Sequence, residues 1–465
     1  MRGRWASVLC GAALASSSCT MMPKYSRPAA PVPPSFPDTP AAQATPTAPA
    51  ASDLRWQEFF TDPRQRSVIE QALANNRDLR VATLNVEKVR ALYRIQSAEL
   101  YPSLGALASV ARQRTPPTSE GGKAETSTQY SVAVGVSAWE LDLFGRVRSL
   151  KAAALQQYFA TEQAQRSAQA ALVAAVAQAY LALAADSEGL RLSQATLEAQ
   201  QSSLDMVQRS RDLGIASDLD LRQVQSQAEA ARADAARYTG LTAVDGNTLQ
   251  LLVGAPVDPA LLPDRLAAVS APQAISAGLS SDVLLRRPDI LMAEHQLRAA
   301  NANIGAARAA FFPRISLTAG VGTVSSELSG LFGAGTGTWS FAPQITAPIF
   351  SGGSLIANLK VSKVNRKIAV AQYEKGIQQA FSEVASALTL RTTLLDQKNA
   401  QEALVRALDD TYRLSEARYK AGIDSYLGVL VAQRSLIAAQ QALVSVRLAE
   451  QANLVTLYNV LGGGV

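Results

Sequence analysis

The sequence is poor in the residues that build most catalytic and metal sites. It has one histidine, His295, and two cysteines, Cys10 and Cys19. Cysteines and histidines form no cluster, which excludes the usual zinc-site spacings, and no group of residues has the pattern of a catalytic site. We therefore expect a protein that is not an enzyme and that needs no cofactor or metal. His295 is expected to make a surface or interhelical contact.

Long apolar runs are also absent. No segment after the N-terminal leader has 18 or more continuous apolar residues, so no membrane-spanning helix is predicted. Such a chain can cross a membrane only as a closed β-barrel. Aromatic residues make up 6% of a chain that is 48% hydrophobic, and the many alanines suit closely spaced long helices. The net charge of +6 comes without a basic stripe interleaved with aromatics, so no nucleic-acid binding is expected.

Residues 1–18 have the features of a secretory signal peptide, with two arginines, an apolar run and then small residues. Cys19 is either an ordinary residue after the cleavage site or a bacterial lipoprotein cysteine that is acylated. Ser16 speaks against acylation, because such signals usually carry leucine there. In favour of it, Cys10 is lost with the leader, which leaves Cys19 without a disulfide partner. Residues 19–55 are predicted to form a lipidated N-terminus and a proline-rich, extended linker.

The rest of the chain repeats one pattern. Residues 56–262 and 263–465 are each predicted to contain a helix, two strands and a long helical hairpin. The two hairpins turn at Gly214 and Gly422, which are 208 positions apart. The shorter helices are predicted at 77–99 and 289–310, and each is expected to end before a residue that precedes proline, Tyr101 or Phe312.

The long helices are predicted from segments without proline, at 147–212 and 352–421. At about 1.5 Å per residue, such a helix reaches roughly 100 Å, about three times the hydrocarbon thickness of a bilayer. This length suits a bundle or coiled coil that spans a compartment wider than a membrane. Glycine is expected to cap the end of each long helix, and Ser217 and Ser425 are candidate N-caps of the helices that follow.

Four segments alternate between apolar and small or polar residues, as strands do. They are 104–112, 130–138, 315–322 and 339–349. An apolar face suits lipid and a small polar face suits water, but four strands are too few to close a barrel, so several chains must share one. Pro343 predicts a local irregularity in the fourth strand. The glycine-rich segments 121–123 and 333–337 are interpreted as mobile hairpin loops, because neither has the sequence of a phosphate-binding loop.

A set of short motifs extends over essentially the whole exported chain. They are Pro23-Lys24-Tyr25-Ser26-Arg27-Pro28, Trp139-Glu140-Leu141-Asp142-Leu143-Phe144-Gly145, Leu285-Arg286-Arg287-Pro288-Asp289-Ile290, Ala299-Ala300-Asn301-Ala302-Asn303-Ile304-Gly305-Ala306-Ala307-Arg308, Phe312-Pro313 and Arg418-Tyr419-Lys420-Ala421-Gly422. Together they resemble the outer-membrane factor family of TolC-like exit ducts, and more closely its OprM/NodT lipoprotein branch.

The resemblance implies a membrane α+β fold. A homotrimer would share a 12-stranded β-barrel in the outer membrane, with four strands per chain, and continue as a long periplasmic α-helical barrel. The implied function is the outer-membrane exit duct of a tripartite efflux pump. A periplasmic adaptor would join it to an inner-membrane transporter, often of the resistance-nodulation-division type.

The resemblance also assigns roles near the hairpin tips. The adaptor-docking surface maps to Gly214, Ile215, Ala216 and Ser217, and to Gly422, Ile423, Asp424 and Ser425. The periplasmic gate maps to Leu427 and Val431 as the constriction, with Tyr419 and Asp220 as a latch. OprM-like members carry aspartate at the position of Val431, so an apolar ring is expected here in place of an acidic one.

Two alternatives remain open. A type I secretion exit duct has the same architecture. A structural trimeric coiled-coil envelope protein would explain the long helices, but it would explain neither the four strands nor the two tips. A duct of this kind selects mainly through its pump, so the sequence assigns no exported substrate.

Overall fold

The computed structural model describes residues 20–36, 54–116, 124–273 and 280–464. The predicted signal peptide, Cys19 and the loop 121–123 lie outside the described residues. The chain forms two compact units, and each draws on both halves of the sequence. The first consists of Met1–Ala29, Val86–Thr161 and Met292–Tyr373, and the second of Ala30–Asn85, Glu162–Leu291 and Glu374–Val465. The predicted division into 56–262 and 263–465 describes the sequence repeat and stays a prediction.

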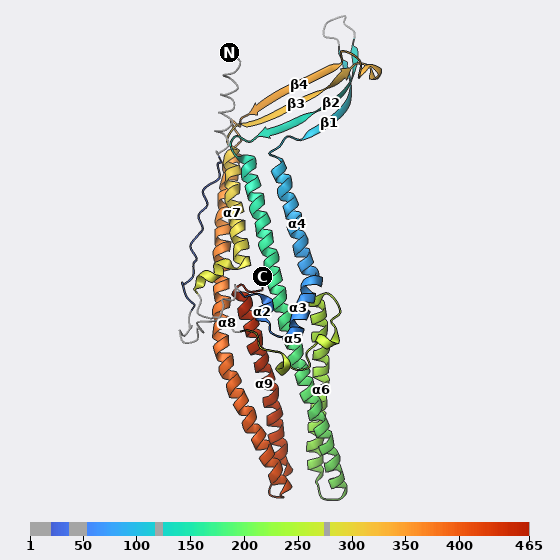
Figure 1. Cartoon of the computed structure of the whole chain (residues 1–465), viewed down its shortest axis with the longest axis vertical. Helices are drawn as coiled ribbons and strands as arrows, with labels where there is room; N and C mark the ends of the chain where they lie inside the picture. The colour runs from blue at the N-terminus through green and yellow to red at the C-terminus, as the bar shows by residue number, and fades with distance from the viewer. Residues whose placement is uncertain (1–19, 37–53, 117–123, 274–279, 465) are drawn as a thin grey trace. The chain divides into compact units, whose positions relative to one another are not determined.

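The first unit contains one antiparallel sheet, in the order β1-β2-β3-β4 (Figure 1). Its strands are β1 Leu104–Thr115, β2 Glu125–Leu141, β3 Arg314–Ser325 and β4 Gly337–Thr346. All four predicted strands are confirmed. β4 ends three residues before the predicted 349, since Pro348 has no N–H with which to continue a ladder.

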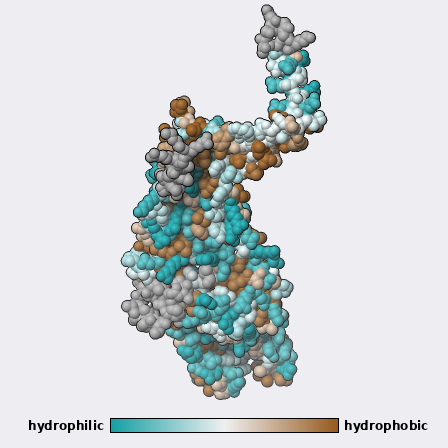
Figure 2. All heavy atoms as spheres, turned by 45° about the horizontal axis from the view of Figure 1, so that its top comes forward, coloured by the Kyte–Doolittle hydropathy of each residue, from teal (hydrophilic) through white to brown (hydrophobic). Residues whose placement is uncertain are grey.

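The alternating residues place large apolar side chains on one face of the sheet. Val134, Val321 and Trp339 are neighbours across three strands, as are Val136, Ala319 and Phe341. Val321 and Trp339 are 66% and 78% exposed in the single chain. Hydrophobic side chains gather over the strands in the space-filling view (Figure 2). The sheet therefore presents an apolar face that nothing covers in the described chain.

The irregularity in the sheet is on β2, so the prediction at Pro343 was wrong. Pro343 pairs in regular register with Leu317, because proline is tolerated on an edge strand such as β4. The register instead shifts between Val136 and Trp139, where Ala138 has a φ of 51°. One extra residue reverses the alternation. The bulge thus keeps Trp139 on the apolar face that Val136 occupies before it.

The four helices with predicted bounds, at 77–99, 147–212, 289–310 and 352–421, are confirmed to within two residues at each end. The helices are α2 Trp56–Phe59, α3 Pro63–Asn75, α4 Arg77–Ala98, α5 Arg146–Asp212, α6 Asp218–Val253, α7 Pro288–Ala309, α8 Ser354–Lys420 and α9 Tyr426–Val460. Short 3₁₀ helices are η4 Pro259–Leu261, η5 Leu266–Ala268, η6 Ser281–Arg286 and η7 Leu328–Gly330. The two 67-residue helices, α5 and α8, confirm that the proline-free segments are continuous helices.

Each long helix folds back into a hairpin in the second unit (Figure 1). In the α8–α9 hairpin, Lys398 Nζ lies 2.6 Å from a Glu450 carboxylate oxygen, and the Gln401 side chain donates to the Ala439 carbonyl at 3.0 Å. In the α5–α6 hairpin, a Cβ added to Gly189 would lie 2.4 Å from the Tyr238 ring. Polar side chains thus join α8 to α9, and the glycine at position 189 leaves room for the Tyr238 ring between α5 and α6.

The core of the second unit is built around Tyr458. Its ring stacks on Phe59 with centroids 3.9 Å apart, and its hydroxyl donates to the Leu54 carbonyl at 2.7 Å. Both rings are almost fully buried. Arg287, from the motif 285–290, is also buried and donates to Asp289, to Glu383 and to the Val460 carbonyl. This motif therefore joins α7, α8 and the end of α9.

In the first unit, the segment that follows Cys19 is held against α7. The buried Glu294 carboxylate accepts hydrogen bonds from Tyr25 and from both Nε and Nη2 of Arg27, the shortest at 2.7 Å. Asn301 donates to the Pro23 carbonyl at 2.8 Å, and a Cβ on Gly305 would lie 2.8 Å from the backbone of Met22. Two of the family-like motifs, 23–28 and 299–308, thus contact each other.

His295 makes an interhelical contact, as predicted, with 2.8 Å between its Nδ1 and the side-chain oxygen of Gln156 on α5. Two helices, α5 and α9, are long and apolar enough to cross a membrane by length and composition. Of the most apolar window of α5, 61% is buried within the chain, and a core helix has the same features. The absence of a membrane-spanning helix therefore stays a prediction.

Candidate functional site at the two hairpin tips

The first tip connects α5 to α6 through a glycine-terminated helix end. Gly214 has a φ of 76° and donates its N–H to the Arg211 carbonyl at 2.8 Å. The next N–H, of Ile215, donates to the Ser210 carbonyl at 2.8 Å. These two bonds form a Schellman motif, which favours glycine because other residues are strained at positive φ. The predicted cap at Gly214 is confirmed.

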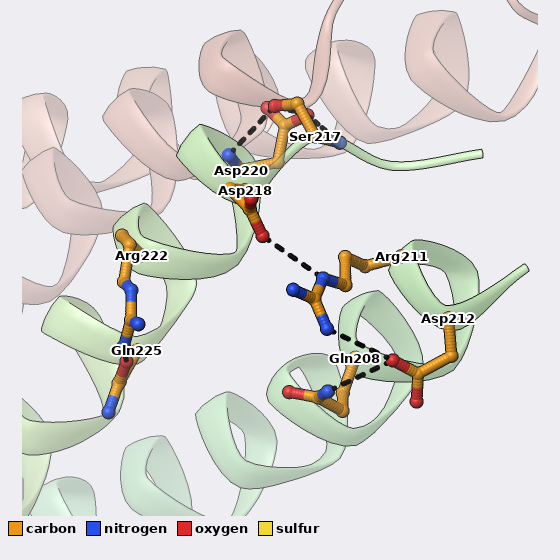
Figure 3. Close-up of polar contacts among 8 residues, drawn as sticks. All are labelled: Gln208, Arg211, Asp212, Ser217, Asp218, Asp220, Arg222 and Gln225. Carbon is orange, nitrogen blue, oxygen red and sulfur yellow. Dashed lines mark hydrogen bonds and ion pairs between the residues drawn. The ribbon is translucent and has the colours of Figure 1, made fainter. Parts of the chain in front are cut away.

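α6 then begins with a capping box. The Asp220 N–H donates to Ser217 Oγ at 3.1 Å, and the Asp220 carboxylate accepts from the Ser217 N–H at 3.1 Å and from its hydroxyl at 2.6 Å (Figure 3). Hydrogen bonds from the Ser217 side chain and backbone lower the pKa of Asp220. Ser217 is therefore the N-cap that the sequence predicts.

An ion pair joins the two helices across this tip (Figure 3). Arg211 Nε lies 3.0 Å from a carboxylate oxygen of Asp218, and this hydrogen bond raises the pKa of Arg211. Leu213 and Ile215 are 76% and 79% exposed beside it. The first tip thus offers two apolar side chains next to a charged pair.

The second tip, between α8 and α9, repeats the same backbone. Gly422 has a φ of 72°, and the N–H groups of Gly422 and Ile423 donate to Tyr419 and Arg418, at 2.9 and 3.0 Å. Arg418 pairs with Asp424 within this tip, with 3.2 Å between Nη2 and a carboxylate oxygen, which lowers the pKa of Asp424. The predicted cap at Gly422 is confirmed.

Ser425 differs from its counterpart Ser217. It occupies the N-cap position of α9, but its side chain makes no capping hydrogen bond. Three residues later the chain has Gly428, which has no side chain to return a bond as Asp220 does at the first tip. The prediction of Ser425 as N-cap therefore holds for its position and is wrong for its side chain.

A small apolar cluster holds the two hairpins together near their tips. Val207, Leu221, Val224 and Leu430 are buried in it, with Leu204, Ala216 and Tyr426 against its edge. The Tyr426 ring also contacts the ring of Tyr419, at 4.9 Å between centroids. This cluster fixes the position of one tip relative to the other.

The predicted gate residues adjoin Tyr426 and Leu430 of this cluster in the sequence but do not belong to it. Leu427 and Val431, one helical turn apart on α9, are 50% and 46% exposed in the single chain. Tyr419 is 38% exposed, and among the described residues it makes no hydrogen bond to Asp220, whose carboxylate binds Ser217. The latch is therefore not formed in this single chain and stays a proposal for the assembled channel.

Sequence reasoning missed the charged and aromatic pairs at the tips. Arg211 and Asp218 are seven residues apart on either side of a tip glycine, and so are Tyr419 and Tyr426. That spacing around an αL glycine is the signal that could have revealed them. Within the described ranges, no group of three or more side chains is placed to hold a metal ion.

The chain is similar to known proteins over most of its length. The family model described as outer membrane efflux protein matches residues 68–255 and 279–463. The chain belongs to this family. The two matched ranges carry the two hairpins, with Gly214 in one and Gly422 in the other.

Named relatives extend over nearly the full length. The probable efflux pump outer membrane protein TtgC of Pseudomonas putida is 50% identical over 454 residues, with 96% of this chain and 93% of the relative covered. The outer membrane protein OprJ of Pseudomonas aeruginosa is 43% identical, with 97% and 94% covered. The open-state MtrE outer membrane channel of Neisseria gonorrhoeae superposes with a TM-score of 0.87 at 40% identity, with 96% and 98% covered. The fold is thus that of outer-membrane efflux channels, and the family is not one of enzymes.

Proposed function

We propose that this chain is the outer-membrane exit duct of a tripartite efflux pump, through which small molecules pass passively to the exterior. The observation that carries the proposal is the match of both repeats to the outer membrane efflux protein family, in a chain with a four-stranded sheet and two long helical hairpins. Relatives with this architecture are named as efflux pump components.

The duct is a homotrimer. A sheet of four strands with two open edges cannot close alone, since about eight strands is the smallest common barrel. Three copies supply 12 strands. The exposed apolar face, with Val321 and Trp339, then meets outer-membrane lipid.

The hairpin tips reach into the periplasm and receive the adaptor, which links the duct to an inner-membrane transporter of the resistance-nodulation-division type. The adaptor makes apolar contacts with Leu213, Ile215 and Ile423, because each of these side chains is at least 62% exposed. Closer to the duct axis, Leu427 and Val431 from three chains form an apolar ring that closes the resting channel by dewetting.

Cys19 carries lipid and anchors the N-terminus to the outer membrane. The residues that follow it support this role, because 21–27 are fastened to α7 through Glu294 and Asn301. Cys19→Ser is expected to abolish labelling with radioactive palmitate and to leave export at least partly intact. Wild-type protein that takes up no label would exclude the anchor.

Two measurements test the function. Purified protein in planar bilayers should give single-channel conductance, and deletion of the gene should raise drug sensitivity that the wild-type copy restores. A structural coiled-coil protein would give no channel. A type I secretion duct would give a channel, but its deletion would abolish secretion of a protein and leave drug sensitivity unchanged.

A further inference from the structure

An aromatic contact joins the two repeats next to the sheet. Phe144, in the segment between β2 and α5, stacks on Phe312, in the segment between α7 and β3. Their ring centroids are 4.8 Å apart and the planes are 21° from parallel. Beside them Glu140 at the end of β2 pairs with Arg314 at the start of β3. The first repeat is thus fastened to the second at one rim of the sheet.

Each of these two aromatic positions recurs at the corresponding place in the other repeat. Tyr101 precedes Pro102 as Phe312 precedes Pro313, and Phe350 follows β4 as Phe144 follows β2. Within the described chain neither ring has an aromatic partner, and Tyr101 and Phe350 are 70% and 91% exposed. Ile349, next to Phe350, is 99% exposed. The sequence thus provides a second set of aromatic residues, Tyr101 and Phe350, that form no aromatic contact within one copy of the described chain.

Strand direction brings these two rings together between copies. The sheet is antiparallel with β1 and β4 as its open edges, so β1 begins at the same rim at which β4 ends. When β4 of one copy meets β1 of the next, the segment after β4 lies beside the segment before β1. Phe350 and Tyr101 are in these two segments.

A cavity lies beside the start of β1, next to Tyr101. β1 starts at Leu104, opposite Val136, whereas β2 continues to Leu141. The uncovered end of β2 lines this recess of about 500 Å³ together with Tyr101, Ile95 and Trp139. The indole Nε1 of Trp139 is buried with no acceptor in the part of the chain that the structure describes. The recess thus offers the rings of Tyr101 and Trp139 and the side chain of Ile95 to an incoming aromatic residue, beside the charged side chains of Glu99, Glu140, Arg146 and Arg314.

We infer that Phe350 of each copy inserts into this recess of the next copy and stacks on its Tyr101. The contact repeats, between chains, the contact that Phe144 and Phe312 make within one chain. This inference rests on the proposed trimer. It assigns Phe350 and Tyr101 as the residues in contact where neighbouring copies meet at the rim of the barrel. The ion pair is not repeated, since Thr346 and Ser103 stand at the positions of Glu140 and Arg314, so the aromatic contact has no ion pair beside it.

Cross-linking between differently tagged chains tests the contact. One chain carries Phe350→Cys and the other Tyr101→Cys, both in a Cys19→Ser background, and the pair is treated in membranes with a short bifunctional maleimide. We expect a linked species that carries both tags. In a single chain, Phe144→Cys with Phe312→Cys should lose both free thiols and gain the mass of one linker, whereas two separate attachments would add two linkers, so this control shows that the reagent spans such a contact.

Phe332→Cys with Tyr101→Cys is the matched negative control. Phe332 is 77% exposed but lies between β3 and β4, at the opposite rim. A trimer that fails to link Phe350→Cys to Tyr101→Cys while the intrachain control reacts would overturn the inference and leave the duct intact. Wild-type protein that runs as a monomer in mild detergent would instead overturn the proposed trimer.

A second measurement does not depend on cross-linking. Phe350→Ala should lower the temperature at which the trimer dissociates in detergent, whereas Phe332→Ala should leave it unchanged. Equal dissociation temperatures for wild type and Phe350→Ala would contradict the contact.

Discussion

Arg211 and Asp218 face each other across the first hairpin tip, with 3.0 Å between the guanidinium Nε and a carboxylate oxygen. At the second tip the positions 208 residues later are Tyr419 and Tyr426, whose rings touch. The tips therefore share a backbone conformation but differ at these two positions, which hold an ion pair at the first tip and an aromatic pair at the second, where the ion pair is instead Arg418–Asp424. In the proposed trimer, three tips of each kind alternate around the periplasmic end.

Asp218→Ala is expected to reduce efflux without changing stability. Exposed ion pairs contribute little to folding, so the unfolding midpoint should match that of wild type, whereas an adaptor that reads the charged tip loses a contact. Asp234→Ala is the control, because Asp234 makes a similarly exposed pair with Arg237 farther along α6. Normal drug resistance in the Asp218→Ala strain would show that the adaptor does not read this pair.

Gly422→Glu is expected to abolish drug resistance while trimer formation and membrane insertion persist. Its Cβ would meet nothing within 4 Å, but a φ of 72° strains any side chain and the charge lies on the docking surface. Gly240→Glu is the control, since Gly240 lies in α6 with nothing within 4 Å of its added Cβ. Measured resistance at the wild-type level would remove Gly422 from the docking surface.

Tyr419→Phe should raise the conductance of the resting channel in planar bilayers. It removes the hydroxyl of the proposed latch, and a buried hydrogen bond to a charged acceptor contributes about 1.5–3 kcal/mol. The single change is cleaner than one that includes Asp220→Ala, because Asp220 also caps α6. Tyr412→Phe, on the same helix, should leave the conductance unchanged. Unaltered conductance in Tyr419→Phe would refute the latch.

Trivalent cations added from the periplasmic side should not block the wild-type channel. The proposed ring of Leu427 and Val431 has no carboxylate to hold them. Val431→Asp should create the block, and the same titration in both channels measures it. Strong block of the wild-type channel would indicate that another acidic ring, of Asp218 or Asp424, forms the constriction.

Asp245 should make the α5–α6 hairpin more stable at mildly acidic pH. Burial, and then the neighbouring Asp186 carboxylate, raise its pKa from 3.8 to about 6. The folded chain thus holds the proton more tightly than the unfolded chain, so this stabilisation is complete below 3.8 and lost as pH rises through about 6. Thermal unfolding followed by circular dichroism at pH 5 and 7.5 measures it.

Asp245→Asn should flatten that pH dependence, because an amide does not titrate. Asp205→Asn, an exposed change on α5, serves as its control and should leave the difference between the two pH values as in wild type. An identical pH dependence in wild type and Asp245→Asn would mean that Asp245 does not titrate in this range.

The sequence by itself determined the local features. The lengths of α5 and α8 follow from proline-free segments, and each hairpin tip follows from one glycine, since a Schellman motif uses hydrogen bonds within six residues. The strands were readable for the same reason, because alternation is a property of neighbours in the chain. The motifs that resemble the family were also visible, although not what each of them contacts.

Tertiary structure decided whatever depends on partners far apart in the sequence. Arg27 and Glu294 are 267 residues apart, and no local sequence pattern predicts that they form an ion pair. The bulge before Trp139 arises from pairing with β3, while Pro343 is accommodated because β4 is an edge. Backbone propensity acts over a few residues, whereas these contacts exist only once the chain has returned on itself.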